Sequence, residues 1–569
     1  MKELWLSNYP AGIAHEIDVD DHSTLIDLCC SAWHRYPRER AFGNFSSYLS
    51  FADVERLSAA FASYLQHQVG LMPGDKVALM MPNALQYPVA MLGVLRAGGI
   101  VVNTNPQYTA RELRHQLSDS EAKCIVVFKG MLRTVHEVVA QTTLRSIVTT
   151  EIGDLFSFPK STLFNRIAQR KYGKFGGQFS IPVTSFTRAL KLGADDAFVP
   201  PVIRPNDLAF LQYTGGTTGI SKGAMLSHGN MVANILQVSA WFGDSIDEGE
   251  EIVITALPLY HIYALTVNCF VFFYHGGLNY LITDPRDTSR LLKEIRRIPF
   301  TGIGGVNTLF KSLLEHKDFK KLNFSRLKYS SGGGAAIQSV VAESWKKATN
   351  KAITEGYGLT EASPVVCSNP FDVAEFTGCI GFPLPSTECK IVTDNGCSAG
   401  IGEPGELLVR GPQIMQGYWR QPEETAAVLD SDGWLRTGDI ALMRDDGYFK
   451  IVDRKKDLIL VSGFNVYPNE IEDVVVSHRG VVDVAAIGVF DAKTTETVKI
   501  VVVRRDPNLN SEDLIEYCRA RLTAYKMPRH VEFVDDLPKS NIGKILRREV
   551  KEKYGAPDEQ CGDRTAKVG

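Results

Sequence analysis

The alternation of strand-like apolar runs with helical patterns limits the fold of this chain more than any other feature. Between residues 50 and 110, a helical pattern at 54–66 leads through the turn LMPGD into the apolar strand KVALMM. The helix PVAMLGVLRAG and the strand IVVN follow, and a similar alternation recurs between residues 209 and 358. Because such alternation is typical of layered sheets flanked by helices, we predict an α/β fold for this part.

The pattern changes twice further along the chain. Residues 376–420 contain short β-branched runs cut by glycine and proline, which predict a small antiparallel β subdomain. After DRKKD (453–457), a hairpin-like segment, helical patterns at 468–478 and 511–522 and several strands predict a compact α+β module. We therefore expect a large N-terminal α/β domain over residues 1–453, a small mobile C-terminal α+β domain over 457–555, and a polar tail over 556–569.

Composition and charge restrict the function classes. The chain has 569 residues, 44% of them hydrophobic and 22% charged, which is ordinary for a globular protein with a large core. The net charge of −3 gives no general attraction to nucleic acid, and we predict no nucleic-acid partner. The ten cysteines include no CxxC pair and no Cys/His cluster with metal-ligand spacing, so we expect reduced thiols rather than a zinc site.

Two further observations predict a cytoplasmic protein. The N-terminus MKELWLSNYPAGIAHEID lacks the basic start and apolar run of a signal peptide. The two most apolar stretches, residues 87–106 and 265–282, contain polar residues such as Arg96, Asn268 and His275. Because neither provides about 20 consecutive apolar residues, we interpret both as core elements rather than membrane spans.

The segment YTGGTTGISKG, residues 213–223, is the strongest functional motif. It follows the apolar run LAFLQ and precedes AMLSHGNMVANI, which we predict to form a turn and a helix. Glycine backbone can wrap closely around phosphate oxygens, while the threonine and serine hydroxyls and Lys222 add donors and positive charge. The segment does not match the Walker A motif, because Lys222 precedes its glycine. It therefore predicts a different kind of nucleotide-phosphate loop.

This loop and six further segments resemble the signature motifs of the adenylate-forming superfamily, which contains acyl-CoA synthetases, firefly luciferase and peptide-synthetase adenylation domains. The further segments, in family order, are PLYHIYAL (258–265), SSGGGAA (330–336), EGYGLTE (355–361), DGWLRTGDI (432–440), DRKKDLILVSGFNVYPNEIE (453–472) and PKSNIGKILRRE (538–549). The resemblance covers nearly the whole chain after about residue 45. Its later motifs are most similar to the fatty-acyl-CoA synthetase branch, particularly bacterial long-chain-fatty-acid–CoA ligases.

The resemblance implies ATP- and AMP-binding roles for residues of several motifs. Tyr357 would offer an aromatic face to adenine, Asp439 would accept both ribose hydroxyls, and Arg454 would lie beside Asp439. The other nucleotide-binding residues would be Tyr213, Thr214, Gly215, Gly216, Thr217, Thr218, Gly219 and Lys222 of the loop, with Gly333, Gly334 and Ala335 close to adenine. Thr360 would donate to the α-phosphate. Glu361 offers the hard oxygen that Mg²⁺ prefers, and Thr217 would be a second ligand.

The resemblance also implies which side chains act on the reacting groups. Lys544 would reach the acyl carboxylate and the α-phosphate, where its ammonium stabilises the charge that builds up during attack. His261 would limit the access of water or carboxylate and would not transfer a proton. A buried structural histidine is the alternative for this position.

Two half-reactions would require two arrangements of the C-terminal domain. Residues 454–456 would form the hinge, in which Lys456 changes its backbone torsions. After rotation, the segment VSGFNVYP would frame the thiol path, and Gly463 would let the chain approach pantetheine closely. The acyl-adenylate is a mixed anhydride, so attack by the thiol expels AMP without a covalent enzyme intermediate. The implied partners are a fatty acid, ATP and CoA, with Mg²⁺ as the cofactor.

The identity of the acid is less constrained. The family match points to a long-chain fatty acid in an apolar tunnel, and residues 301–309, TGIGGVNTL, resemble a tunnel-lining segment, although these glycines could equally form a turn. Leu265 stands where some long-chain enzymes carry a gating tryptophan. The alternatives are a medium-chain or aryl-acid CoA ligase, a fatty-acyl-AMP ligase and, from another class, a non-catalytic acyl-adenylate or lipid-binding protein. The intact motif residues argue against the last alternative.

Residues 156–179 form an insert with an unusual local charge. From Lys160 to Lys174 it contains five basic residues and no acidic one, interleaved with Phe164, Ile167 and Tyr172. Such a segment either lies against anionic lipid headgroups on the cytoplasmic face of a membrane or is a solvated surface loop. A homodimer is a further prediction about partners.

Overall fold

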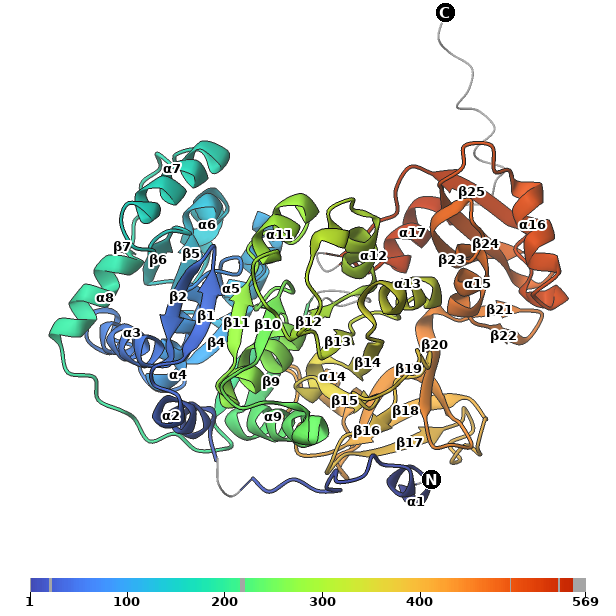
Figure 1. Cartoon of the computed structure of the whole chain (residues 1–569), viewed down its shortest axis with the longest axis horizontal. Helices are drawn as coiled ribbons and strands as arrows, with labels where there is room; N and C mark the ends of the chain where they lie inside the picture. The colour runs from blue at the N-terminus through green and yellow to red at the C-terminus, as the bar shows by residue number, and fades with distance from the viewer. Residues whose placement is uncertain (1, 20–22, 215–220, 492, 541–542, 556–569) are drawn as a thin grey trace, which may run out of the picture.

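The computed structural model describes residues 2–19, 23–214, 221–491, 493–540 and 543–555. A large body contains two extended sheets and a small β subdomain, and a smaller C-terminal module lies against one side of it (Figure 1).

The first sheet of the body is parallel except at one edge. Its order is β7-β6-β5-β3-β4-β8-β9, and β9 pairs antiparallel with β8. Its strands are β3 (Lys76–Met80), β4 (Ile100–Asn103), β5 (Cys124–Phe128), β6 (Ser146–Thr150), β7 (Val183–Ser185), β8 (Leu208–Tyr213) and β9 (Gly223–Ser227). Because successive strand side chains point to opposite faces, Val77 and Leu79 enter the central core. Ala78 and Met80 enter a second core with α5 (Ala110–Ser120) and α6 (Leu132–Val138).

The second sheet has the order β16-β15-β14-β13-β12-β10-β11-β1-β2. Its strands are β1 (Arg40–Asn44), β2 (Ser47–Ser50), β10 (Ile252–Thr255), β11 (Leu278–Leu281), β12 (Gly302–Gly305), β13 (Tyr329–Gly332), β14 (Ile353–Gly358), β15 (Val365–Ser368) and β16 (Phe382–Pro383). The run from β1 to β14 pairs in parallel, whereas β2, β15 and β16 are antiparallel additions. The predicted α/β layering is therefore confirmed.

Helices of the body pack on these sheets, and several of them contribute to the central core. They are α1 (Lys2–Ser7), α2 (Leu25–Arg35), α3 (Phe51–Tyr64), α4 (Gln86–Arg96), α8 (Phe186–Asp195), α9 (His228–Phe242), α10 (Phe272–Tyr274), α11 (Thr288–Ile295), α12 (Asn307–Glu315), α13 (Ser339–Thr349) and α14 (Pro422–Val428). The apolar stretch at 87–106 forms α4 and β4. The stretch at 265–282 continues the π-helix η5 (Ala264–Val271) into α10 and β11, and both stretches are core elements as predicted. Among the described helices, none combines the length and apolar character needed to cross a membrane.

The small β subdomain is larger than the sequence indicated. Four antiparallel strands have the order β17-β18-β19-β20. They are β17 (Glu388–Val392), β18 (Gly405–Arg410), β19 (Leu435–Met443) and β20 (Phe449–Arg454). The predicted segment at 376–420 supplies only the first two. The later strands join them because DGWLRTGDI and the residues before DRKKD pair as a hairpin.

The C-terminal module is an α+β unit, as predicted. Its sheet has the order β22-β21-β24-β23, and β25 pairs with β24. The elements are β21 (Ile459–Val461), β22 (Phe464–Val466), α15 (Pro468–Val476), β23 (Val481–Asp491), β24 (Thr495–Arg504), α16 (Ser511–Arg519), β25 (His530–Val534) and α17 (Arg547–Tyr554). Pro468 is suited to the start of α15, because a first-turn amide needs no partner within the helix. The two predicted helices are shorter than their sequence patterns, because α15 ends at Val476 rather than at 478 and α16 ends at Arg519 rather than at 522.

The basic insert forms the helix α7 (Lys160–Tyr172) rather than a loop. This helix lies at the edge of the body, next to α6 and β6 (Figure 1). Phe164 packs on Phe45 and Phe156, with ring centroids 4.9 and 5.3 Å apart respectively. Leu163 and Ile167, one helical turn apart, are 57% and 48% exposed. The insert therefore has one anchored face and one apolar face toward solvent.

Candidate active site between the body and the C-terminal module

The residues predicted to bind nucleotide gather where several parallel strands end. Tyr213 ends β8, Gly333 follows β13 and Thr360 follows β14, and ligands in open α/β sheets bind at the carboxyl ends of strands. A cavity of about 2870 Å³ lies there, and the C-terminal module supplies part of its lining, including Lys544. The cavity brings together motifs that are far apart in the sequence.

The ribose-binding pair predicted from the sequence is formed by two neighbouring strands. Asp439 on β19 and Arg454 on β20 are register partners, and Arg454 Nε lies 3.4 Å from Asp439 Oδ1. The Tyr357 hydroxyl donates to Asp439 Oδ2 at 2.6 Å, and burial, followed by the charge of Asp439, raises the pKa of Tyr357. The three side chains therefore form one connected polar group at the cavity. The Tyr357 hydroxyl holds the carboxylate while its ring remains a candidate surface for adenine.

The segment predicted to pass adenine follows β13 directly. Gly333, Gly334 and Ala335 all line the cavity. A Cβ added to Gly333 would lie 3.2 Å from the Tyr263 ring, and Gly334 has a φ of +76°, which favours glycine. Backbone with small side chains at this point leaves space on the cavity side.

Part of the phosphate loop lies outside the described residues. Gly215, Gly216, Thr217, Thr218 and Gly219 belong to that part, so their predicted roles are not described further. The two ends of the loop are close together, because the Thr214 amide donates to the Lys222 carbonyl at 2.9 Å. The Tyr213 hydroxyl donates to Asp119 Oδ2 at 2.5 Å and is thus used within the protein.

The environment of Glu361 contains two residues that the sequence reasoning missed. The Tyr418 hydroxyl donates to Glu361 Oε1 at 2.7 Å. Lys222 forms an ion pair with Glu424, and its ammonium lies 5.1 Å from the centre of the Tyr418 ring. The two missed residues are Tyr418 and Glu424. Both lie in the polar, aromatic run GYWRQPEET (417–425) between β18 and β19, which belonged to none of the motifs.

The oxygen donors at this point fit magnesium. Mg²⁺ is usually bound by one or two carboxylates together with substrate phosphates and water, and Glu361 offers a carboxylate beside the ends of the phosphate loop. Tyr418 fixes one of its oxygens by a hydrogen bond, which orients the carboxylate. Thr360 lines the same cavity one residue earlier, in the 3-10 turn Thr360–Ala362.

His261 and Lys544 line the same cavity. Burial, followed by the charge of Lys544, lowers the pKa of His261 to about 4. His261 is therefore neutral near pH 7. Its Nδ1 accepts from the Tyr263 amide at 3.4 Å, which orients the ring.

Lys544 enters from the C-terminal module in a tight local turn. Its amide donates to Ser540 Oγ at 3.1 Å, and the Ser540 amide donates to its carbonyl at 2.7 Å. Burial and, second, the positive charge of Arg454 lower the pKa of Lys544 to about 8, while Asp439 opposes this shift. The module is thus arranged with the Lys544 ammonium beside the predicted ribose-binding pair.

The predicted hinge and CoA-path residues occupy different surroundings. Lys456 lies in the 3-10 turn Lys455–Asp457 directly after β20 and lines the cavity. Gly463 lies in the turn between β21 and β22 with a φ of +84°, and it is not among the described residues that line the cavity. The β21–β22 hairpin would reach the site only after the module rotates.

Part of the cavity lining consists of apolar side chains of the body. These include Val238, Trp241, Val267, Phe371 and Leu384. Of the segment 301–309, which was expected to line a tunnel, only Asn307 and Thr308 belong to the described lining. The glycines of this segment lie in β12, and a Cβ on Gly302 would be 2.0 Å from Tyr329. These glycines therefore belong to a strand rather than a turn, and they are not among the described residues that line this cavity. Leu265 is completely buried in η5.

Comparison with known proteins agrees with this geometry. The family model described as AMP-binding enzyme matches residues 31–419, and the model described as AMP-binding enzyme C-terminal domain matches residues 470–544. The chain belongs to the AMP-binding enzyme family, the adenylate-forming group that its motifs resemble.

Curated relatives are similar over nearly their whole length. A long-chain-fatty-acid–CoA ligase of Escherichia coli O157:H7 is 53% identical over 97% of this chain and 98% of the relative. A protein of the same name from Bacillus subtilis is 37% identical over 96% of this chain and 98% of the relative. A feruloyl-CoA synthase of Amycolatopsis is 32% identical over 91% and 96% of the two chains.

Solved structures share the architecture. ATP-bound MatB from Rhodopseudomonas palustris superposes with a TM-score of 0.77 at 28% identity, covering 93% of this chain and 98% of that one. The anthranilate CoA ligase AuaEII in complex with anthranoyl-AMP gives a TM-score of 0.82 at 22% identity, covering 94% and 99%, which supports the fold alone.

Proposed function

We propose that this chain is an AMP-forming long-chain fatty acyl-CoA ligase. The observation that carries the proposal is the meeting of the Lys544 ammonium with the Asp439–Arg454 pair in one cavity whose lining also includes apolar side chains of the body. Similarity to curated long-chain-fatty-acid–CoA ligases over nearly the full length supports the choice of acid. Its substrates are a fatty acid, ATP and CoA.

In the first half-reaction, a carboxylate oxygen of the fatty acid attacks the α-phosphorus of ATP. The bond from that phosphorus to the bridging oxygen breaks, and pyrophosphate leaves with the electron pair. Asp439 would orient the ribose, Tyr357 would contact adenine, and Lys544 with Thr360 would stabilise the charge at the α-phosphate. Magnesium held by Glu361 would neutralise the phosphate oxygens of the leaving group.

In the second half-reaction, the CoA thiolate attacks the acyl carbonyl carbon, and the bond to the AMP oxygen breaks. We propose that the module rotates about residues 454–456 for this step, so that Gly463 lies beside the pantetheine path. The position of the β21–β22 hairpin away from the cavity supports a requirement for rotation.

Substrate profiling tests this function. Pyrophosphate release and thioester formation are measured with ATP and CoA across straight-chain acids of increasing length, with benzoate and ferulate as controls. Thioesters formed fastest from long-chain acids are expected, because their tails would bury the most apolar surface against the apolar part of the lining. Thioester from aryl acids alone would indicate the other ligase class, and adenylate without thioester would indicate an acyl-AMP ligase. No product from any fatty acid would contradict the proposal.

We also propose that α7 binds the surface of an anionic membrane. Its exposed face combines Leu163 and Ile167 with the exposed guanidinium groups of Arg166 and Arg170, and Phe158 before the helix is 83% exposed. Apolar side chains beside basic ones suit the boundary between acyl chains and anionic headgroups. Not all five basic residues face outward, because Lys160 donates to the Phe45 carbonyl and Lys171 pairs with Asp284 at 3.3 Å.

Vesicle sedimentation tests the membrane proposal. The variant Arg166→Gln/Arg170→Gln should bind phosphatidylglycerol vesicles more weakly by roughly thirtyfold, since each basic residue contributes about 1 kcal/mol near such a surface. The control Lys317→Gln/Lys320→Gln removes two exposed charges from another surface and should bind like the original chain. Equal binding by all three proteins would contradict a role for α7. The predicted homodimer is measured separately by sedimentation equilibrium.

A further inference from the structure

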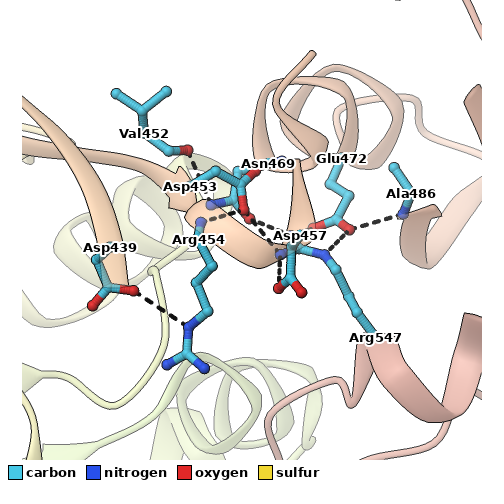
Figure 2. A network of polar contacts seen from close by, with 9 residues as sticks. All are labelled: Asp439, Val452, Asp453, Arg454, Asp457, Asn469, Glu472, Ala486 and Arg547. Carbon is cyan, nitrogen blue, oxygen red and sulfur yellow. Dashed lines mark hydrogen bonds and ion pairs between the residues drawn. The ribbon is translucent and has the colours of Figure 1, made fainter. Parts of the chain in front are cut away.

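A dense polar cluster joins the C-terminal module to the last strand of the body, and Arg547 is at its centre (Figure 2). Arg547 is the first residue of α17 and follows Lys544 by three positions. Its Nε and Nη2 donate to the two carboxylate oxygens of Glu472 at 2.9 and 2.6 Å. Its Nη1 lies 3.2 Å from Asp453 Oδ1 and 3.4 Å from Asp457 Oδ2. Nη2 also donates to the Asn469 side chain.

These contacts are of two kinds. Glu472 and Arg547 both follow the predicted hinge at Lys456, so their pairing moves with the module as one body. Asp453 precedes the hinge and lies in β20, so its pairing with Arg547 connects the body to the module. A rotation about the hinge would leave the first kind intact and would break the second.

A second pair of bonds crosses the hinge at the same point. The Asn469 amide at the start of α15 donates to Asp453 Oδ2 at 2.8 Å. The Asn469 side-chain amide donates to the Val452 carbonyl at 3.1 Å. Asp453 thus uses both carboxylate oxygens to hold module residues, one from α15 and one from α17.

The burial of Asp453 makes these bonds selective for one arrangement. Its side chain is 0% exposed, and a buried carboxylate is stable only when it is paired and hydrogen-bonded. Burial raises the pKa of Asp453 to about 6, and the charge of Arg547 opposes that shift. If the module moved away, the carboxylate would exchange the guanidinium for water. The cluster therefore favours the arrangement in which α15 and α17 lie against β20.

The same arrangement places Lys544 in the cavity. Gly543 packs so closely on the body that an added Cβ would lie 2.2 Å from Thr308 Oγ1 of α12. Contacts with the body therefore fix the chain on both sides of Lys544. Gly543 precedes it and packs on Thr308, and Arg547 follows it and pairs with Asp453. Arg547 also lines the cavity, but its guanidinium donates to protein carboxylates and to the Asn469 side chain, which fits a supporting role.

We propose that Asp453, Asn469 and Arg547 form a latch across the hinge that holds the module in the adenylating arrangement and is released before thioester formation. The inference rests on the proposed two-step function. Asp453 and Arg547 are positioning residues, because they act through the placement of Lys544. Glu472 pairs with Arg547 on the same side of the hinge, so its bonds do not cross the hinge and it is not part of the latch.

The half-reactions test the latch. Asp453→Asn should lower palmitate-dependent ATP–pyrophosphate exchange by about tenfold or more, because a buried charged hydrogen-bond partner is lost from that arrangement. Thioester formation from supplied palmitoyl-adenylate and CoA should remain within about threefold or increase, since this step requires release. In the matched control Glu472→Gln, both half-steps should change by the same factor. Equal losses in both half-steps of Asp453→Asn would overturn the latch.

A measurement without substrates keeps the latch separate from the proposed function. Lys455 and Lys456 are exposed, and trypsin cleavage after them reports opening at the hinge. Asp453→Asn should be cleaved there several-fold faster than the original chain, whereas Glu472→Gln should not, with the thermal unfolding midpoint recorded for each protein to exclude global unfolding. Unchanged cleavage in Asp453→Asn would overturn the latch even if the ligase activity is found. Faster cleavage would support it even if no acid is activated.

Discussion

The large body and the C-terminal module bring charged side chains to one cavity by different means. Asp439 and Arg454 are register partners on adjacent strands of one sheet, so backbone hydrogen bonds determine their separation. Lys544 lies in a segment whose position depends on contacts between the two parts, including Gly543 on Thr308 and Lys311 Nζ on the Val482 carbonyl at 2.5 Å. Groups held by a sheet should serve both half-reactions. A group delivered by a movable module should serve one of them.

Removing the ammonium of the module should produce the largest effect. Lys544→Ala should slow adenylation by on the order of 10²–10³, as is typical for the loss of one preorganised donor to developing charge. Thioester formation from supplied acyl-adenylate should stay largely intact, and separate assays of the two half-steps measure the difference. Lys551→Ala on the exposed side of α17 is the control. If Lys544→Ala slowed both steps equally, the contrast between body and module would be lost.

A change in the body should impair both steps. Asp439→Asn removes the charge that Arg454 and Tyr357 surround, and both ATP and acyl-adenylate carry the ribose that it would hold. We expect kcat/KM to fall roughly tenfold to a hundredfold in each half-reaction, because a hydrogen bond to a charged group contributes about 1.5–3 kcal/mol. Asp445→Asn in the exposed turn after β19 is the matched control. A loss confined to adenylation would argue against the ribose role.

The pH dependence separates the two regions further. The pKa of Lys544 is lowered to about 8 by burial and by Arg454, so raising the pH through this value removes its charge. Since kcat/KM reports the free enzyme, adenylation measured with limiting ATP should fall about tenfold per pH unit above about 8. Thioester formation from supplied adenylate should lack this limb. In Lys544→Arg the fall in kcat/KM above pH 8 should disappear, because guanidinium stays charged. An unchanged fall would mean that another group titrates there.

The smallest expected effect concerns a fixed contact within the body. Tyr418→Phe removes the donor to Glu361 and keeps the ring that lies near Lys222. Adenylation should fall by roughly tenfold, with a raised requirement for Mg²⁺, because an unoriented carboxylate binds the ion less well. Tyr448→Phe, which changes a hydroxyl outside the described cavity lining, provides the control. Unchanged magnesium dependence in Tyr418→Phe would remove Tyr418 from the site.

The sequence by itself determined the layered α/β body, the C-terminal α+β module and the family, because periodicity and ordered motifs are local properties of the chain. It also predicted site roles for Asp439, Arg454, Tyr357 and Lys544 from their places in those motifs, and the structure brings all four to one cavity. It did not find Tyr418, Asp453 or Arg547 as functional partners, because their contacts join segments 57 or 94 positions apart. Nor did it predict that Gly302 lies in the strand β12, directly beside Tyr329 of β13. Only the tertiary structure decides which distant side chains share a buried carboxylate, since such pairing depends on how the elements pack and not on the local pattern of the sequence.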